Sequence, residues 1–149
     1  MILLVHLLFG AAIGSAIKNI PLAIILAFLS HYFLDLFPHI EYPIENLRKK
    51  QWDRVATEVL SIFLDFCLGI LIIIFLAKNQ LFVYVCALLA IIPDGLTVLS
   101  YLFPNKVFTL HDIFHRQKIH FLKDKKISNF WRITSQILAA IISIAILIS

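Results

Sequence analysis

The chain has 149 residues, of which 61% are hydrophobic and 15% are charged, whereas soluble domains carry about 25% charged residues. Its mean hydropathy is +0.94. These values exclude an ordinary soluble domain and place the chain among membrane proteins, with room for one domain. The net charge of +4 is interpreted as basic loops held against anionic lipid, and no nucleic-acid partner is expected.

Five apolar segments predict an all-α fold, a polytopic membrane helical bundle formed by residues 1–149 as a single domain. Two pairs of segments are separated by only two or three polar residues, which predicts tight helical hairpins at Lys18–Asn19 and Lys78–Gln80. The expected membrane segments are Met1–Ile17, Ile20–Phe37, Ala56–Ala77, Leu81–Phe103 and Ile133–Ser149.

The first segment is expected to remain part of the folded chain. It lacks the basic start of a signal peptide and runs almost directly into the second segment. Its small residues from Gly10 to Ala16 predict a face that packs closely against another helix. The two cysteines, Cys67 and Cys86, lie inside apolar segments and are interpreted as small buried hydrophobic residues.

Two longer connections, at residues 38–55 and 104–132, carry eleven of the thirteen basic residues, and the short turns carry only Lys18 and Lys78. The positive-inside rule therefore places both connections and the N-terminus in the cytoplasm and the C-terminus outside. The second connection, which includes Lys123, alternates apolar and charged side chains. This pattern predicts one or two short helices at the membrane interface or folded back onto the bundle.

His31 and Asp35 lie four residues apart, so they share one face of a helix near its end. Pro38 is expected to end that helix. His39 follows the stop and, like His111, is expected to be solvated. A carboxylate and an imidazole this close to a membrane helix end are costly unless another group stabilises them.

The other ionisable residues of the apolar segments are expected on the same side of the bundle. Asp65 and Asp94 each lie about nine residues from the cytoplasmic end of their segment, roughly 13 Å at 1.5 Å per residue. A single cavity open to the cytoplasm could therefore hold them all. Its candidate residues are His6, His31, Asp35, Asp65, Asp94, His115 and His120.

Imidazoles and carboxylates without usable thiols suit a divalent metal ion, and Zn²⁺ fits best. Pro93 and Gly95 flank Asp94 and predict a break in the helix that opens a pocket. His115 and His120 are five apart and converge only if their helix ends between them. The predicted metal ligands are His6, His31, Asp35, Asp94, His115 and His120.

Each of these residues also has a structural interpretation. His6 is as compatible with an interhelical hydrogen bond as with a metal ligand, and Asp65 could bond to Ser61 or to another helix. Histidines could also relay protons without a metal. The set as a whole favours a metal site, because ionisable groups inside membrane helices are rare.

The stretch from Val5 to Gly14 resembles the opening of a family of small bacterial membrane-bound metal-dependent hydrolases. Those proteins carry a Pro-Asp pair after an apolar segment, matched by Pro93-Asp94, and then a His-Arg…His element. Where their Pro-Asp element continues to an acidic residue and a histidine, this chain has Gly95 and Leu96. The His-Arg…His element of those membrane proteins is matched by His115, Arg116 and His120. Separately, the His-x-x-x-Asp spacing of His31 and Asp35 is similar to the metal motif of zinc-dependent phospholipase C.

These observations predict a hydrolase that acts on a phosphoester of a lipid or lipid-linked substrate, with a metal ion activating water. Asp65 or a carboxylate that does not bind the metal would be the general base, and Arg116 or Lys118 would bind the anionic group. The alternatives are a membrane protein that binds or carries a divalent cation, and an interaction scaffold that uses its basic loops.

Overall fold

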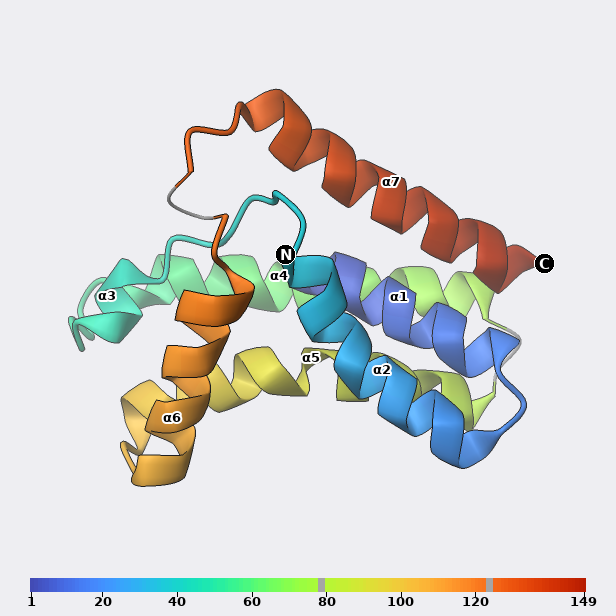
Figure 1. Ribbon diagram of the computed structural model, residues 1–149, viewed down its shortest axis with the longest axis horizontal. Coiled ribbons are helices and arrows are strands. Elements are labelled where there is room, and N and C mark those ends of the chain that lie inside the picture. The colour runs from blue at the N-terminus through green and yellow to red at the C-terminus, as the bar shows by residue number, and fades with distance from the viewer. Residues whose placement is uncertain (78–79, 123–124) are drawn as a thin grey trace.

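A computed structural model describes residues 1–77, 80–122 and 125–149, and every regular element in these ranges is a helix (Figure 1). The predicted all-α bundle is therefore confirmed. The predicted hairpin residue Lys78 and the basic residue Lys123 lie outside the described ranges. The five apolar helices are α1 (Leu3–Ala16), α2 (Ile20–Asp35), α4 (Val55–Leu76), α5 (Leu81–Leu102) and α7 (Asn129–Ile148).

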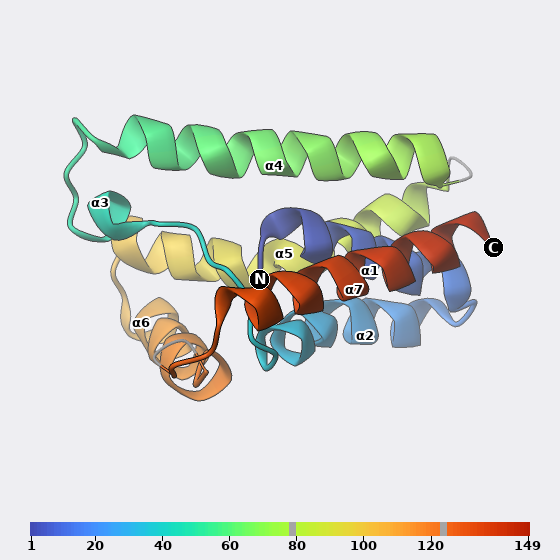
Figure 2. The same ribbon diagram turned by 90° about the horizontal axis from the view of Figure 1, so that it is seen from above.

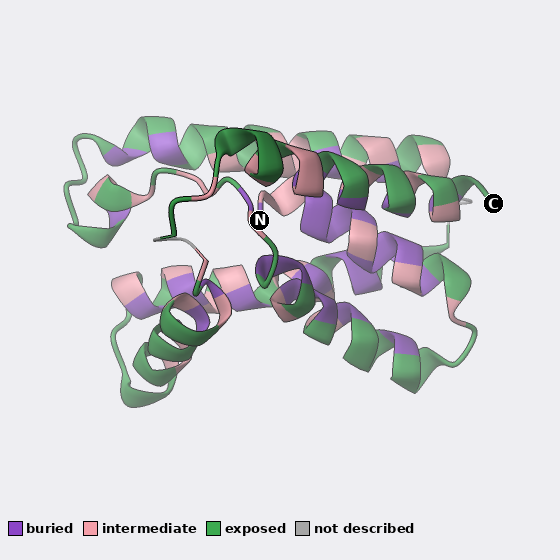
Figure 3. Ribbon diagram, turned by 45° about the horizontal axis from the view of Figure 1, so that its top comes forward, coloured by how far each residue is buried: buried purple, intermediate pink, exposed green. Residues whose placement is uncertain are grey.

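Helices α4, α5 and α7 are long and apolar enough to cross a membrane, with 22, 22 and 20 residues. Helices α1 and α2 are shorter, with 14 and 16 residues. Helix α1 lies inside the bundle and contacts α2, α4, α5 and α7 (Figures 1 and 2). Its side chains are mostly buried, whereas the outer faces of α4 and α7 are exposed and rich in Leu, Ile and Phe (Figure 3). Large apolar side chains thus face outward, the reverse of their usual place in a soluble protein, and this suits contact with lipid.

Close packing between α1 and α5 depends on two glycines. A Cβ atom added to Gly10 would lie 2.6 Å from the carbonyl oxygen of Cys86 and 2.6 Å from the Cβ atom of Ala90. At Gly14 it would lie 2.9 Å from the Cβ atom of Cys86. The predicted small-residue face is thus the surface that admits α5, and Cys86 is buried in the contact.

The two longer connections form short helices at one end of the bundle. Helix α3 (Glu45–Arg48) precedes α4, whereas α6 (Lys106–Phe114) and a π-helical turn, η1 (His115–Ile119), follow α5. Figure 1 shows α6 running across the bundle end, beside the start of α1 and the end of α2. The expected short helices of the second connection are therefore present, and the described basic residues of both connections gather at this end.

The break expected at Pro93 is wrong, because α5 continues without interruption from Leu81 to Leu102. Proline removes one backbone N–H, and membrane helices tolerate this loss when nearby polar groups bond the freed carbonyls. The carbonyl of Ala90, three residues before Pro93, accepts a hydrogen bond from His31 Nδ1 at 2.8 Å. The carbonyl freed by Pro93 is that of Leu89, four residues earlier, so the bond from His31 to Ala90 is a separate contact that joins α2 to α5 beside the proline.

Replacing Gly10 by Ala should destabilise the protein by about 1–3 kcal/mol, because the added methyl group meets backbone atoms of α5. The matched control is Gly95→Ala, where an added Cβ atom has no neighbour within 4 Å. That change should be neutral or stabilising by up to about 1 kcal/mol. Thermal unfolding in detergent micelles measures both, and an equal response of the two variants would contradict the packing between α1 and α5.

Candidate metal centre

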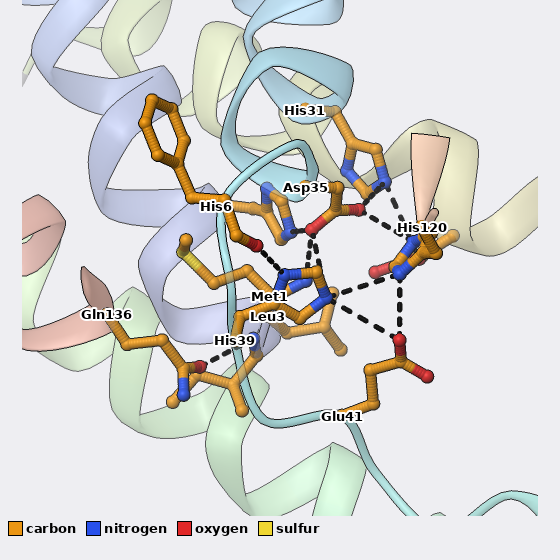
Figure 4. A network of polar contacts seen from close by, with 12 residues as sticks. Met1, Leu3, His6, His31, Asp35, His39, Glu41, His120 and Gln136 are labelled. Carbon is orange, nitrogen blue, oxygen red and sulfur yellow. Dashed lines mark hydrogen bonds and ion pairs between the residues drawn. The ribbon is translucent and has the colours of Figure 1, made fainter. Parts of the chain in front are cut away.

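The carboxylate of Asp35, the last residue of α2, is the centre of a buried cluster of imidazoles (Figure 4). Asp35 is only 1% exposed. Its Oδ2 atom lies 3.1 Å from His31 Nε2, 3.3 Å from His115 Nε2 and 3.1 Å from His120 Nε2. The predicted pair of His31 and Asp35 is thus joined by two histidines from the far connection.

The second carboxylate oxygen of Asp35 faces a different set of groups. Its Oδ1 atom lies 3.3 Å from His6 Nε2 and 3.7 Å from His39 Nε2. The amino group of Met1 also contacts this oxygen. Five histidines from three separate parts of the chain therefore surround one carboxylate, and all five present their Nε2 atoms to it.

Hydrogen bonds to the opposite ring nitrogen hold four of these imidazoles in place. Nδ1 of His31 donates to the carbonyl of Ala90, and Nδ1 of His39 donates to the carbonyl of Phe37 at 2.7 Å. A neutral imidazole protonated at Nδ1 carries a lone pair at Nε2. His31 and His39 are therefore fixed in the tautomer that binds a metal through Nε2.

His115 and His120 are held in the same way. His115 Nδ1 lies 3.2 Å from the hydroxyl of Thr97, and His120 Nδ1 lies 2.8 Å from a carboxylate oxygen of Glu41. A carboxylate behind the distal ring nitrogen is the common support of a metal-binding histidine. Both rings thus keep Nε2 toward Asp35.

These contacts crowd imidazole nitrogens and carboxylate oxygens into one small volume. His31 Nε2 lies 3.1 Å from His115 Nε2 as well as beside Asp35. Because the Nδ1 atom of His31 already donates to Ala90, its Nε2 atom has only a lone pair to offer. A cation among these atoms would turn mutual repulsion into attraction, and the buried group of histidines and aspartates could hold a metal ion.

His6 supplies a second observation of the same kind. Its side chain is fully buried, and neither ring nitrogen makes a hydrogen bond within the described part of the chain. The ring stacks on that of His31, with centroids 4.1 Å apart. A buried polar group without a hydrogen-bond partner is costly, so its Nε2 atom beside Asp35 is well suited to a ligand.

The π-helical turn η1 explains how His115 and His120 meet although they are five residues apart. The backbone N–H of His120 bonds to the carbonyl of His115 at 3.1 Å, a wider turn than that of an α-helix. Their Nε2 atoms consequently lie 3.2 Å apart. The rings of His115 and His120 therefore converge as expected, because the wide turn brings them together and the helix ends directly after it.

Charge at the edge of the cluster shows in the pKa values of His115 and His120, the two histidines that the second connection contributes. Burial opposes protonation of His120, but hydrogen bonds with Asp35 and Glu41 outweigh it and raise its pKa to about 9. Burial lowers the pKa of His115, and the bond with Asp35 offsets this only in part. The carboxylates therefore favour positive charge on the side where His120 lies.

Asp94 borders both the cluster and a cavity of about 430 Å³. Its carboxylate lies 3.5 Å from His31 Nε2 and is 32% exposed. His115 and His120 line the same cavity, and so do Arg116 and Tyr101. The rest of the wall is mainly apolar, with side chains such as Ile62, Ile91, Val98 and Leu99.

Asp65 does not join the cluster, although it was expected to serve as a base. Its carboxylate accepts hydrogen bonds from the backbone N–H of Leu4, at 2.7 Å, and from the hydroxyl of Tyr42. That hydroxyl in turn accepts from the N–H of Leu3 at 3.1 Å. Burial and the bond to Asp65 raise the pKa of Tyr42, so its hydroxyl remains a donor. Asp65 thus satisfies the free N–H groups at the start of α1, where Ile2 provides no side-chain cap.

Arg116 occupies the cavity wall and is held by an acidic residue of α6. Its Nε and Nη2 atoms donate to the carboxylate of Asp112 at 2.9 and 2.7 Å. This bidentate pair fixes the guanidinium beside the cavity.

His39 and Glu41 are functional candidates that the sequence did not identify. His39 was expected to be solvated, but it is only 5% exposed and lies 3.2 Å from His120 Nδ1. The chain folds back after Pro38 because Arg132 of α7 donates to the carbonyl of His39 at 3.1 Å. The sequence offered one indication that His39 and Glu41 belong to the site: His39 lies four residues after Asp35 and two residues before Glu41.

His111, also expected to be solvated, is partly buried and bonds to the hydroxyl of Tyr32 through Nε2 at 3.0 Å. Its ring stacks on that of His115 without contributing a nitrogen to the cluster. His111 is therefore a neighbour of the candidate site.

Comparison with known proteins adds no relative. No family model matches the chain, and neither a curated protein nor a solved structure shows significant similarity to it.

Replacing Asp65 by Asn should destabilise the protein by about 1–3 kcal/mol, because the amide accepts less strongly and places a donor near Leu4 N–H. Its metal content should not change. The matched control is Ser61→Ala, one turn earlier on α4, where an exposed hydroxyl bonds only to its own helix. Thermal unfolding together with elemental analysis tests this role, and loss of bound metal in the Asp65 variant would contradict it.

Proposed function

We propose that the protein is a membrane-embedded, metal-dependent hydrolase. The observation that carries this proposal is the convergence of Nε2 lone pairs on the buried carboxylate of Asp35, with the Nδ1 atoms of His31 and His39 already committed as donors. A divalent cation would be bound by these nitrogens and the carboxylate together, and it would also use the buried ring of His6, which makes no hydrogen bond within the described residues. The residues that would hold it are His6, His31, Asp35, Asp94, His115 and His120, with His39 added by the structure.

The donor set suits Zn²⁺, since it combines imidazole and carboxylate without thiolate. Cys86 is buried between α1 and α5, and Cys67 lies on α4 outside both groups of candidate ligands. A bound divalent cation supplies Lewis-acid chemistry and lowers the pKa of water toward neutrality. Glu41 orients His120, and Asp94 lies at the boundary of the cluster and the cavity in which a substrate would bind.

The cavity supports an amphipathic anion as the substrate, such as a phosphoester of a lipid or a lipid-linked molecule. Its wall offers apolar side chains for an acyl or isoprenoid portion and the guanidinium of Arg116 for an anionic group. Asp65 lies ten residues into α4, about 15 Å from the start of that helix, and bonds to the beginning of α1. The cluster therefore lies at a depth where a membrane lipid can reach it.

The distribution of charge supports an integral membrane location with the cluster facing the cytoplasm. The described basic residues of both long connections are at the cluster end of the bundle, which the positive-inside rule assigns to the cytoplasm. A carrier of divalent cations is less well supported. Toward the opposite end, the described parts of α1, α2, α4, α5 and α7 contain no Asp, Glu, His, Lys or Arg side chain that could pass an ion onward.

Metal content tests the proposal first. Protein purified without chelators should contain a divalent metal, and His31→Ala and His115→Ala should each lower its amount because each removes an Nε2 ligand. The matched control is His111→Ala, which removes a ring one helical turn away without removing a nitrogen from the cluster. Elemental analysis of the folded variants decides the matter. Absence of metal from the wild type, or an equal loss in the His111 variant, would contradict a site built on these residues.

Hydrolysis by the reconstituted protein tests the reaction. Release of phosphate or of a phosphorylated headgroup from anionic lipid vesicles should require the metal and should be lost in Asp94→Asn. Arg116→Ala should raise KM roughly tenfold or more, since a charged hydrogen bond contributes about 1.5–3 kcal/mol. Metal binding combined with cation flux and no hydrolysis would instead establish the carrier.

A further inference from the structure

The two oxygens of Asp35 contact separate sets of imidazoles. Oδ2 faces His31, His115 and His120 at 3.1–3.3 Å. Oδ1 faces His6 at 3.3 Å and His39 at 3.7 Å. A carboxylate that binds a single ion through one oxygen needs further ligands beside that oxygen only. In this protein imidazoles lie beside both oxygens, and a single ion does not explain this.

The candidate ligands also divide into two groups by distance. One group contains His31, Asp35, Asp94 and His115, and within it the ligand atoms all lie within 4.8 Å of one another. The other contains Asp35, His39 and His120 under the same criterion. Asp35 is the one member that the two groups share.

The ring of His120 lies between the two groups. Its Nε2 atom lies 3.2 Å from His115 Nε2, and its Nδ1 atom lies 3.2 Å from His39 Nε2 and 2.8 Å from Glu41. The second group thus has its own acidic neighbour, as Asp94 serves the first.

The number of ligands exceeds what one ion takes. A zinc site uses four protein ligands when structural and three when catalytic. The first group alone supplies four side chains, which leaves His39, His120 and the buried His6 without a role at a single ion. A second ion between Asp35, His39 and His120 would use them, and it would take the place of the amino group of Met1 at Oδ1.

We propose that the cluster is a binuclear metal centre in which Asp35 bridges two divalent cations. His31, Asp94 and His115 complete the first position, and His39 and His120 complete the second, with His6 beside the bridging oxygen. Paired ions about 3.5–4 Å apart stabilise both the attacking and the leaving oxygen of a phosphoester. This inference rests on the proposed metal-dependent function and specifies the phosphoester class of substrate within it.

Metal stoichiometry of the full chain in detergent, after chelation and reloading with Zn²⁺, tests the inference. The wild type should bind two ions per chain, and His39→Ala and Asp94→Asn should each bind one. Asp35→Asn should retain no more than one, because an amide nitrogen is not a metal ligand and the side chain no longer bridges. His111→Ala is the matched control and should keep two, with size-exclusion profiles showing that every variant is folded.

The outcomes separate the two proposals. One ion per chain in the wild type, unchanged by His39→Ala, would overturn the binuclear centre and leave the metal-dependent hydrolase standing. No bound ion would overturn both. Reloading with Mn²⁺ adds a readout independent of binding amounts: a bridged pair should give the electron paramagnetic resonance spectrum of two coupled ions. The spectrum of isolated Mn²⁺ at full loading would contradict the bridge.

Discussion

A carboxylate buried at the end of a membrane helix is the constraint on which the organisation of this protein depends. An isolated buried charge costs several kcal/mol, and Asp35 is almost completely removed from solvent. The chain surrounds it with imidazoles from α1, α2, the segment after α2 and η1. The amino group of Met1 and these histidines lower the cost, and the Nδ1 bonds of His31 and His39 direct the Nε2 lone pairs of both rings toward the same point. A cation resolves both problems, so the fold and the proposed metal site have one physical origin.

The rest of the bundle positions this cluster. Gly10 and Gly14 let α1 approach α5 closely, which brings His6 and Asp94 to the same imidazole, that of His31. Asp65 and Tyr42 bond the first N–H groups of α1 and so fix the level at which that helix begins. The outer faces of the long helices are exposed (Figure 3) and apolar, so the polar residues are gathered inside and at one end.

The sequence predicted those parts of the fold that follow from local patterns. Apolar runs marked the five long segments, and the four-residue spacing of His31 and Asp35 marked the first two members of the cluster. The topology-based depth argument grouped His6, Asp94, His115 and His120 with them, and the structure brings these residues together.

The failures have tertiary causes. His39 follows a proline in a segment without regular structure, and only its contact with α7 returns it to the interior. Pro93 was expected to break α5, but the helix continues through it, packed against α1 and α2. Asp65 was grouped with the cluster by depth alone, whereas the need of α1 for a cap determines its contacts. In each case the residues that decide the outcome lie far away in the sequence, so the local pattern could not predict them.

X-ray absorption at the metal edge of protein purified without added chelator tests the central claim most directly, because it reports the atoms around the ion. The structure predicts a first shell of nitrogen and oxygen at about 2.0–2.2 Å, with the outer-shell scattering of several imidazole rings and no sulfur. A first shell of oxygen alone, or one that contains sulfur, would contradict a metal centre built around Asp35.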